Sequence, residues 1–289
     1  MSDNAGTTPE LRPLRPDQEA LPYAKYYYRP VAPPNPRLME ILSRGPMDPA
    51  KALPYERIND LLDPGYHEVE TGYCLLENGA GYVAVNNVFP GCTPEMMQWW
   101  FAWHAAGPGL RYAIWYPPGH VTIAVSDRDR AKLLDPNVPL EQKSQNVEHF
   151  VVEDVGGGLD DIVITFLDPA TMGFDMSRFH KPNVACVFGG FGIQESRTGP
   201  PIKVPAIMLH FCREIEGGVE FRTRFWLGYR INKGKGMCVL PPGVRVPLEA
   251  PMGLAFHNVM EYSNLASILP ELYAVFCLGI RPPPRKEPK

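Results

Sequence analysis

Residues 252–276, near the C-terminus, read MGLAFHNVMEYSNLASILPELYAVF, and this stretch decides the fold. At 100° per residue, one narrow side of the predicted helix carries His257, Glu261, Asn264, Leu265, Ile268 and Leu272. An imidazole and a carboxylate therefore lie one turn apart on the side that also carries the apolar anchors. Burying either group without a partner costs free energy. Two interpretations remain open: His257 and Glu261 satisfy each other as a core pair, or both bind a metal ion.

The composition is that of an ordinary globular protein. The chain has 289 residues, of which 45% are hydrophobic, and its 28 basic and 32 acidic residues give a net charge of -4. This length allows one large domain, or one domain with an appendage. There is no long basic run in the folded part, so we expect no nucleic acid partner. The polar, proline-broken N-terminus has no signal-peptide core or membrane span, so we expect a cytoplasmic protein with no membrane partner.

The cysteine pattern limits the kind of metal site that the chain can form. The six cysteines are Cys74, Cys92, Cys186, Cys212, Cys238 and Cys277. They are widely scattered and show no CxxC spacing. This pattern predicts buried thiols in a reducing compartment rather than disulfides or a thiolate metal site. Any metal ion would therefore be held by nitrogen and oxygen ligands.

The order of the elements predicts an α+β protein. Residues 1–60 are rich in proline, which predicts an arm laid over the core or over a partner subunit in a dimer. Its tyrosines, which would suit an interface or plain packing, are Tyr23, Tyr26, Tyr27 and Tyr28. Residues 61–280 contain many strand-like runs and the long terminal helix, and residues 281–289 are predicted to be disordered. A curved antiparallel sheet wrapped round the terminal helix would enclose a cavity.

The middle of the chain contains one predicted helix and several predicted strands. Thr93 as N-cap and Pro94 at the first helical position open the helix PEMMQWWFAWHAA, in which His104 is interpreted as a packed or capping residue. Residues 110–120, LRYAIWYPPGH, and 121–126, VTIAVS, are predicted to be strand-like runs joined by a Pro-Pro-Gly turn. The runs VEHFVVEDV and DIVITFLD are predicted to be a second strand pair. The sequence has no GxSxG elbow, which excludes the usual serine hydrolase.

The segment PAIMLHFCREIEGGVEFRTRFWLGYRI, residues 205–231, predicts a β-hairpin. If Gly217 and Gly218 form a two-residue turn, His210 lies directly opposite Phe225. The same register places Met208, His210 and Cys212 on one face, and Arg222, Arg224 and Trp226 on the other. A histidine in the middle of an apolar face is more often a satisfied core residue than a catalytic one.

The segments WWFAWH, LRYAIWYPPGH, VVEDVGGG, FRTRFWLG and AFHNVME follow one another in an order that resembles the diacetylphloroglucinol hydrolase family, which includes phloretin hydrolases. The resemblance covers most of the chain from about residue 60 onward. It implies a helix-grip fold of the Bet v 1-like type, found in plant allergens and lipid carriers. It also implies one zinc ion in the cavity, held by two histidines and two glutamates, and a homodimer.

The same resemblance implies roles for individual residues. The implied zinc ligands are His120, Glu153, His257 and Glu261, with Asp154 or Glu148 as alternatives to Glu153 if the alignment shifts. Tyr112 resembles a residue that hydrogen-bonds to a phenolic oxygen, and His210 resembles a histidine at the reacting group. Two substrate-binding positions depart from the family pattern: Phe225 replaces a tyrosine, and Ile123 replaces an asparagine. Both changes remove a hydrogen-bonding group, which leaves the exact substrate open.

These features together indicate a zinc-dependent hydrolase acting on a small aromatic ketone. The expected reaction breaks the carbon-carbon bond between an acyl group and a phloroglucinol-type ring, as in phloretin or diacetylphloroglucinol. His210 would shuttle the proton to the ring, for which a pKa near neutral is suitable. Two alternatives stay open: a non-catalytic carrier of hydrophobic ligands, and a metal-dependent retro-Claisen or aldol-type enzyme acting on a β-diketone.

Overall fold

The computed structural model of the protein describes residues 11–179, 183–197 and 203–280. Its centre is an eight-stranded antiparallel sheet in the order β1-β2-β8-β7-β6-β5-β4-β3. The strands are β1 (Gly72–Leu75), β2 (Gly81–Pro90), β3 (His120–Ala124), β4 (Glu148–Asp154), β5 (Leu159–Phe166), β6 (Cys186–Ser196), β7 (Lys203–Ile215) and β8 (Gly218–Leu227). A small separate hairpin pairs β9 (Tyr229–Asn232) with β10 (Lys235–Cys238).

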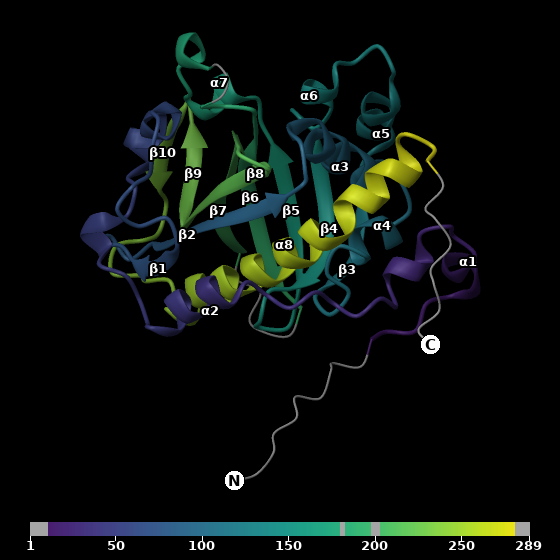
Figure 1. Cartoon of the computed structure of the whole chain (residues 1–289). Helices are drawn as coiled ribbons and strands as arrows, with labels where there is room; N and C mark the ends of the chain where they lie inside the picture. The colour runs from purple at the N-terminus through teal and green to yellow at the C-terminus, as the bar shows by residue number, and fades with distance from the viewer. Residues whose placement is uncertain (1–10, 180–182, 198–202, 281–289) are drawn as a thin grey trace.

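The C-terminal helix α8 (Glu249–Phe276) lies across one face of the curved sheet (Figure 1). The shorter α-helices are α1 (Pro16–Glu19), α2 (Pro36–Ser43), α3 (Pro94–Ala106), α4 (Leu110–Ala113), α5 (Asp127–Leu134), α6 (Leu140–Lys143) and α7 (Pro169–Met172). Four 3-10 helices complete the described elements: η1 (Ala24–Tyr26), η2 (Pro49–Lys51), η3 (Tyr55–Leu62) and η4 (Met176–Arg178). The predicted α+β fold, with an antiparallel sheet gripping a terminal helix, is therefore confirmed.

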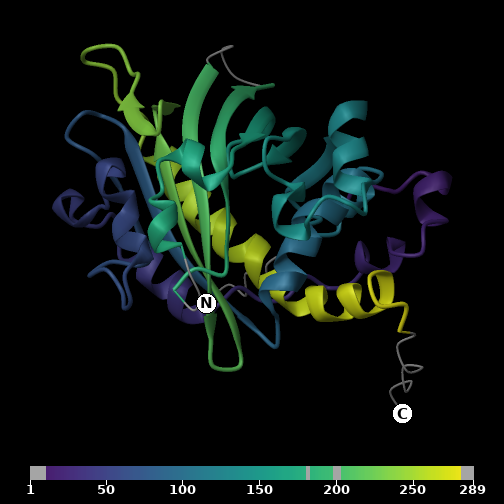
Figure 2. The same cartoon turned by 90° about the horizontal axis from the view of Figure 1, so that it is seen from above.

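The apolar core lies on both faces of the sheet. On the face covered by α8, Phe101 of α3 and Phe221 of β8 belong to the same cluster of buried side chains as Leu265 of α8. On the opposite face, the rings of Tyr55 and Trp226 lie 5.1 Å apart, so that η3 packs against the sheet. Figure 2 shows this layering from above, with α8 on one side of the strands and the blue segment of the N-terminal region on the other. Buried side chains on both faces therefore pack the sheet between α8 and the N-terminal region.

The N-terminal arm runs along α8 and fixes its position. The Tyr26 hydroxyl donates to Glu271 Oε1 at 2.8 Å, and the backbone N–H of Ala32 donates to Asn264 Oδ1 at 3.0 Å. Tyr23, Tyr26 and Tyr27 are buried within the chain, whereas Tyr28 is exposed. These contacts satisfy polar groups of α8 over its C-terminal half. The predicted contact of the arm with a second subunit stays a prediction, and the predicted disordered tail, residues 281–289, lies outside the described residues.

The hairpin of β7 and β8 differs from its predicted register. His210 pairs with Thr223 rather than Phe225, because the two-residue turn consists of Glu216 and Gly217. Gly217 has φ +77°, a left-handed conformation that favours glycine, and Gly218 already belongs to β8. The shift preserves the face of every side chain, since each residue's partner moves by two positions. His210 therefore still faces the α8 side, and Arg222, Arg224 and Trp226 face the other side as predicted.

Two other expectations need correction. The run LRYAIW is not a strand, because residues 110–113 form helix α4. Consecutive apolar residues there are buried on all sides, and a short continuous apolar run does not distinguish a strand from a buried helix. The six cysteines are free, but Cys238 is half-buried and Cys277 is exposed, so the prediction of buried thiols holds for the other four.

A buried cluster of charges joins the chain before β1 to the outer face of the sheet. Glu70 accepts hydrogen bonds from Arg222 Nη2 and Arg224 Nη2, each at 2.6 Å. Both guanidinium groups are almost fully buried, and together they hold the pKa of the Glu70 carboxyl down at about 2, despite the opposing effect of burial. The carboxylate therefore compensates two buried positive charges at once.

Replacing Glu70 with alanine is expected to lower the free energy of unfolding by about 3 kcal/mol, because two buried guanidinium groups lose their carboxylate. Thermal or urea unfolding of the purified variant measures the change. Glu68→Ala is the matched control, since the ion pair of Glu68 with Lys51 is exposed and should contribute little to stability. Equal losses in the two variants would contradict this account of the cluster.

Candidate metal centre and active-site cavity

A cavity of about 420 Å³ lies between α8 and the sheet. Its wall is largely apolar, with Phe101, Ile164, Phe166, Met208 and Phe225 among the lining residues. Exposed lining residues such as Gly156 and Glu249 mark the open end of the cavity. Its size and mixed wall are typical of a site for a small molecule.

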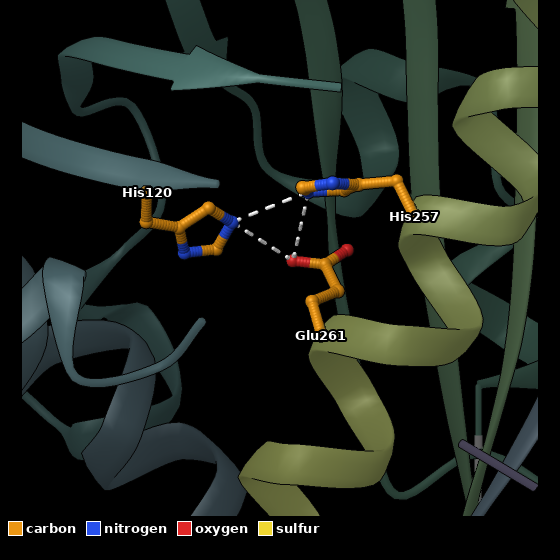
Figure 3. Close-up of side chains that lie close together, drawn as sticks. All are labelled: His120, His257 and Glu261. Carbon is orange, nitrogen blue, oxygen red and sulfur yellow. Dashed lines mark hydrogen bonds and ion pairs between the residues drawn. The ribbon is translucent and has the colours of Figure 1, made fainter. Parts of the chain in front are cut away.

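Three ionisable side chains meet beside this cavity (Figure 3). His120 begins β3, directly after the Pro-Pro-Gly turn, while His257 and Glu261 lie one turn apart on α8. The Nε2 atoms of His120 and His257 are 3.3 Å apart, and Glu261 Oε2 lies 3.4 Å from His120 Nε2 and 3.9 Å from His257 Nε2. These groups, all buried, form a candidate metal site.

Glu153 lies beside His120 of this cluster. It is the cross-strand partner of His120, and its Oε2 atom lies 3.5 Å from His120 Nε2. The two alternative carboxylates have other contacts: Asp154 accepts from the backbone N–H groups of Gly156 and Gly158, and Glu148 accepts from Thr165 at the other end of β4. The structure therefore brings His120, His257 and Glu261 together in one cluster, and of the three carboxylates considered for the fourth position Glu153 is the one that lies beside His120.

The spacing of His120, His257 and Glu261 fits one metal ion. Zinc ligands lie about 2.0–2.2 Å from the ion, so two ligands in tetrahedral geometry lie about 3.3–3.6 Å from each other. The distance between the two imidazole nitrogens, 3.3 Å, and the distance from His120 Nε2 to Glu261 Oε2, 3.4 Å, fall in this range, whereas the distance from His257 Nε2 to Glu261 Oε2 is longer, at 3.9 Å. The donors are two nitrogens and one oxygen, with the Glu153 carboxylate 3.5 Å from His120, and zinc accepts ligands of these kinds.

The pKa shifts of the four side chains also favour a bound cation. Burial, with the nearby Glu153, raises the pKa of Glu261 well above its usual value, and burial raises the pKa of Glu153 to about 7. Burial also lowers the pKa of His257 to about 4 and that of His120 well below 6.5. Both imidazoles are therefore neutral at pH 7, so no positive charge on them compensates the two carboxylates. A divalent cation would supply that compensation.

The pH dependence of stability tests this arrangement. A carboxyl group whose pKa rises on folding stabilises the folded state fully below its unfolded pKa, and this stability is lost as the pH rises through the folded pKa. The buried histidines, whose pKa values are lowered, act in the opposite direction near pH 6.5, but they contribute equally to the wild-type protein and to Glu153→Gln. Relative to Glu153→Gln, the chelated wild-type protein is therefore expected to lose stability, on the order of 1 kcal/mol, between pH 6.5 and 8. Thermal unfolding of the two proteins, with and without added metal, checks this; a chelated wild-type protein that gains stability relative to the variant over this range contradicts the assignment.

Neighbouring groups hold the candidate ligands in position. Asn258 donates to Glu261 Oε1 at 3.1 Å and accepts from Asn87 at 2.9 Å, so a buried amide pair fixes the carboxylate. The guanidinium of Arg12 donates to the backbone carbonyl of His120 at 3.2 Å. A Cβ on Gly119 would lie 2.8 Å from the Tyr116 ring, 2.9 Å from the Asp154 carbonyl oxygen and 3.0 Å from the His257 ring, so there is little space for a side chain next to His120.

A second polar group lies across the cavity from the candidate ligands. His210 Nδ1 is 2.9 Å from Thr223 Oγ1, and its Nε2 is 3.2 Å from the Tyr262 hydroxyl. A hydroxyl can donate or accept, so either ring nitrogen can carry the proton. Burial lowers the pKa of His210 to about 3, which differs from the near-neutral value expected from the sequence. His210 is therefore a neutral imidazole flanked by two hydroxyl groups.

The remaining predicted site residues have different positions. Tyr112 lines the cavity, donates its hydroxyl proton to Glu153 Oε2, and stacks on His120 at 4.2 Å between ring centroids. Phe225 also lines the cavity, with its ring 5.9 Å from that of His210, so the two remain neighbours despite the register shift. Ile123 belongs to the hydrophobic core and is not among the residues that line the cavity in the described part of the chain.

Sequence reasoning missed two residues of the cavity wall. Tyr262 lies directly after Glu261, but the narrow helical face used in the prediction excluded it. His149 precedes Glu153 by four residues in β4, so the period of two places both on the same face. That alternation was present in VEHFVVED and could have identified His149 as a lining residue.

Comparison with known proteins places the chain in a family. Residues 53–274 match the sequence family described as "DAPG hydrolase PhiG domain", which covers most of the chain. The chain belongs to the DAPG hydrolase family. Within this family, it is 36% identical to a phloretin hydrolase of Eubacterium ramulus over 262 residues, which are 89% of this chain and 91% of that protein.

Other members of the DAPG hydrolase family are also similar to the chain. A 2,4-diacetylphloroglucinol hydrolase of a Pseudomonas species is 31% identical over 266 residues, which are 88% of each chain. The protein of the same name from Pseudomonas protegens is 30% identical over 266 residues, which are 88% of this chain and 84% of that one. Among solved structures, the plant protein Ara h 8.0201 aligns with a TM-score of 0.38 and 8% identity, over 67% of this chain and 99% of the other.

Proposed function

We propose that this protein is a zinc-dependent hydrolase that cleaves the carbon-carbon bond between an acyl group and a phloroglucinol-type ring. The observation that supports this most strongly is that the cluster of His120, His257 and Glu261 lies beside the cavity whose wall also includes Glu153 and the hydrogen-bonded His210. Relatives in the same family are named as hydrolases of phloretin and of 2,4-diacetylphloroglucinol. The products would be a carboxylic acid and a free phenol.

Zinc is the proposed cofactor, and His120, Glu153, His257 and Glu261 would hold it. The two imidazoles are already neutral, and the two carboxylates would neutralise the charge of the ion. When bound, zinc would polarise the ketone oxygen and hold the water for the reaction. Two carboxylate ligands make this water less acidic than three imidazoles would, so the polarisation of the ketone is the larger contribution.

Tyr112 would orient the aromatic ring. Its only hydroxyl proton is donated to Glu153, so its oxygen is left to accept a hydrogen bond from a ring hydroxyl of the substrate. Its ring, stacked on His120, holds that oxygen next to the candidate metal site. The acyl carbon of the bound substrate would then lie between the metal site and His210.

His210 would move the proton. As a neutral imidazole it can take a proton from a ring hydroxyl and deliver it to the ring carbon that bears the acyl group, which gives a cyclohexadienone-like tautomer. Tyr262 and Thr223 contact the two ring nitrogens and would stabilise either tautomer of the imidazole. Water then adds its oxygen to the acyl carbon, the carbon-carbon bond breaks, and its electron pair restores the aromatic ring as the remaining water proton returns to a ring oxygen.

Incubation with phloretin and with 2,4-diacetylphloroglucinol, followed by mass spectrometry, tests the proposal. The expected products are phloroglucinol with hydroxyphenylpropionic acid from the first, and an acetylphloroglucinol with acetic acid from the second. Elemental analysis of the purified protein should find about one zinc ion per chain. Full activity after removal of all metal, or no cleavage of either compound by the zinc-loaded protein, would show that the proposal is wrong.

One observation keeps a second reaction open. Phe225 lines the cavity beside His210 but offers no hydrogen bond to a ring oxygen, and Ile123 lies in the core. A β-diketone needs fewer such hydrogen bonds, so retro-Claisen or aldol-type chemistry at the same metal remains the second candidate. Turnover of an aliphatic β-diketone without turnover of phloretin would favour it. A non-catalytic carrier, by contrast, should contain no stoichiometric zinc.

Two expectations about the cellular state of the protein stay predictions. In the part of the chain that the structure describes, no helix has both the length and the apolar character needed to cross a bilayer. We propose a cytoplasmic location, which the free cysteines support, and a homodimer, with which the exposed Tyr28 of the arm is compatible.

A further inference from the structure

Two further histidines line the most buried part of the cavity. His104 of α3 and His149 of β4 are each 2% exposed, and their ring centroids lie 5.6 Å apart. The surrounding wall is apolar, since Phe166 packs on His149 at 4.7 Å and Phe101 lies 5.7 Å from His104. Both histidines are buried, unlike the exposed lining residues Gly156 and Glu249. The mechanism above does not use it.

Tyr112 joins this pair to the candidate metal site. Its ring centroid lies 4.2 Å from that of His120 and 6.1 Å from that of His104. A ligand whose ring hydroxyl contacts Tyr112 can therefore reach towards His104 with another part of the molecule. His104 and His149 therefore line the same cavity as the proposed active site, but at a different position in its wall.

The hydrogen bonds of the two imidazoles are incomplete. His104 Nδ1 lies 2.7 Å from the backbone carbonyl of Trp100, so the proton is on Nδ1 and Nε2 has a free lone pair. Among the described residues, His149 makes no hydrogen bond; its Nε2 is fully buried, so a ligand in the cavity can contact only its Nδ1. A polar group without a partner in an apolar wall costs free energy, so a bound group that satisfied Nδ1 would bind more tightly.

The unpaired nitrogens of His104 and His149 indicate which chemical group could bind between them. Burial lowers the pKa of His104 to about 4 and that of His149 well below 6.5, so both rings are neutral. Together they offer one fixed acceptor, His104 Nε2, and one N–H donor on His149. A hydroxyl group donates one hydrogen bond and accepts another, so it satisfies both. A ketone or ether oxygen only accepts, and a carboxylate would face the lone pair of His104.

We propose that His104 and His149 form a subsite that binds a phenolic hydroxyl of the substrate. This inference rests on the proposed function, because it concerns the recognition of the same aromatic substrate. The hydroxyl is either on the ring that loses the acyl group or on a distal ring at the end of the acyl chain. The chemistry is the same in both cases, and matched ligands distinguish them.

Calorimetric titration of the zinc-loaded protein with ligands that lack the ketone, and so are not cleaved, tests the subsite. The first set compares an alkylphloroglucinol with the two alkylresorcinols that each lack a different ring hydroxyl. The second set compares phenylpropyl-phloroglucinols with and without a hydroxyl on the distal phenyl ring. Loss of the hydroxyl that occupies the subsite is expected to weaken binding by about 10-fold or more, because it leaves buried groups unpaired.

His149→Phe and His104→Phe are the test variants. Each should weaken binding of the hydroxylated ligand to the level of its matched ligand without the hydroxyl, while leaving the affinity for the latter within about 2-fold. His149→Gln, which keeps an N–H donor, should restore part of the discrimination. His149→Phe should not lower the melting temperature, because the imidazole that it removes has no hydrogen-bond partner in the described chain.

Three results would overturn the subsite. In the first, the wild-type protein binds all ligands of both sets equally. In the second, discrimination persists unchanged in both phenylalanine variants. In the third, the variants lose affinity for every ligand alike, which indicates a structural role. The first two leave the proposed function intact if phloretin is still cleaved, whereas a protein that neither binds nor cleaves any of these phenols contradicts both proposals.

Discussion

Replacing His257 with alanine is expected to remove the bound metal and to lower turnover of an acylphloroglucinol by on the order of 10³-fold or more. His257 Nε2 lies 3.3 Å from His120 Nε2 and 3.9 Å from Glu261 Oε2, so its loss removes one side of the candidate site. The two carboxylates, whose pKa values burial already raises, would then take up protons instead of holding a cation. Elemental analysis measures the metal, and a mass-based assay with phloretin measures turnover.

His67→Ala is the matched control for this experiment. His67 is a half-buried histidine outside the cavity lining, so its removal should change neither metal content nor turnover. Glu261→Gln keeps the shape of the side chain but not its charge, and it should lower metal content as His257→Ala does. A His257→Ala protein that keeps one equivalent of zinc and full activity would falsify the metal assignment.

The helical pair of His257 and Glu261 is the part of the candidate site that the sequence predicts best. His257 and Glu261 are four residues apart, so any helix over residues 252–276 places them on one side. Helical spacing alone did not decide between a core pair and a metal site. The metal-site interpretation also requires His120 and Glu153, which belong to other elements. These two residues are brought together by the pairing of β3 with β4. The resemblance to a family provided that long-range information.

The hairpin shows the limit of local rules. Which face each residue occupies follows from alternation alone, so His210 was placed on the correct side of the sheet. The register depends on which two residues form the turn, and two adjacent glycines leave this choice open. The structure decides it through a neighbour distant in sequence: a Cβ on Gly218 would lie 2.3 Å from the Phe89 carbonyl oxygen of β2, so this glycine is needed in the strand. Pairing between β2 and β8 is not visible in the hairpin sequence.

The pKa of His210 could not be predicted from the sequence, because it also depends on neighbours that are distant in the sequence. A near-neutral pKa presumes contact with water or with a carboxylate, whereas the structure surrounds the imidazole with aromatic rings and two hydroxyl groups. Burial is set by packing between α3, α8 and the sheet, which no single segment encodes. The low pKa keeps His210 neutral at pH 7 and weakens it as a base, so it would act as a donor only after it has taken a proton from the bound substrate.

Replacing His210 with phenylalanine is therefore expected to lower kcat by about 10³-fold, within the usual range for a positioned acid-base group. Metal content should not change, because His210 lies across the cavity from the candidate ligands. Binding of an uncleaved alkylphloroglucinol should stay within a few-fold. Tyr262→Phe and Thr223→Val each remove one hydroxyl partner of the imidazole, so each should lower kcat by a smaller factor, about 10-fold.

The pH profile distinguishes a proton-transfer role of His210 from a structural one. In the wild-type protein, kcat should fall at low pH as the imidazole and the carboxylates take up protons, and this fall should be shallower in His210→Phe because one titrating group is gone. Met208→Leu is the control for packing, since Met208 lies on the same face of β7, two residues away, and carries no acid-base group. If His210→Phe and Met208→Leu lower kcat equally and leave the shape of the pH profile unchanged, His210 packs in the cavity wall without moving a proton.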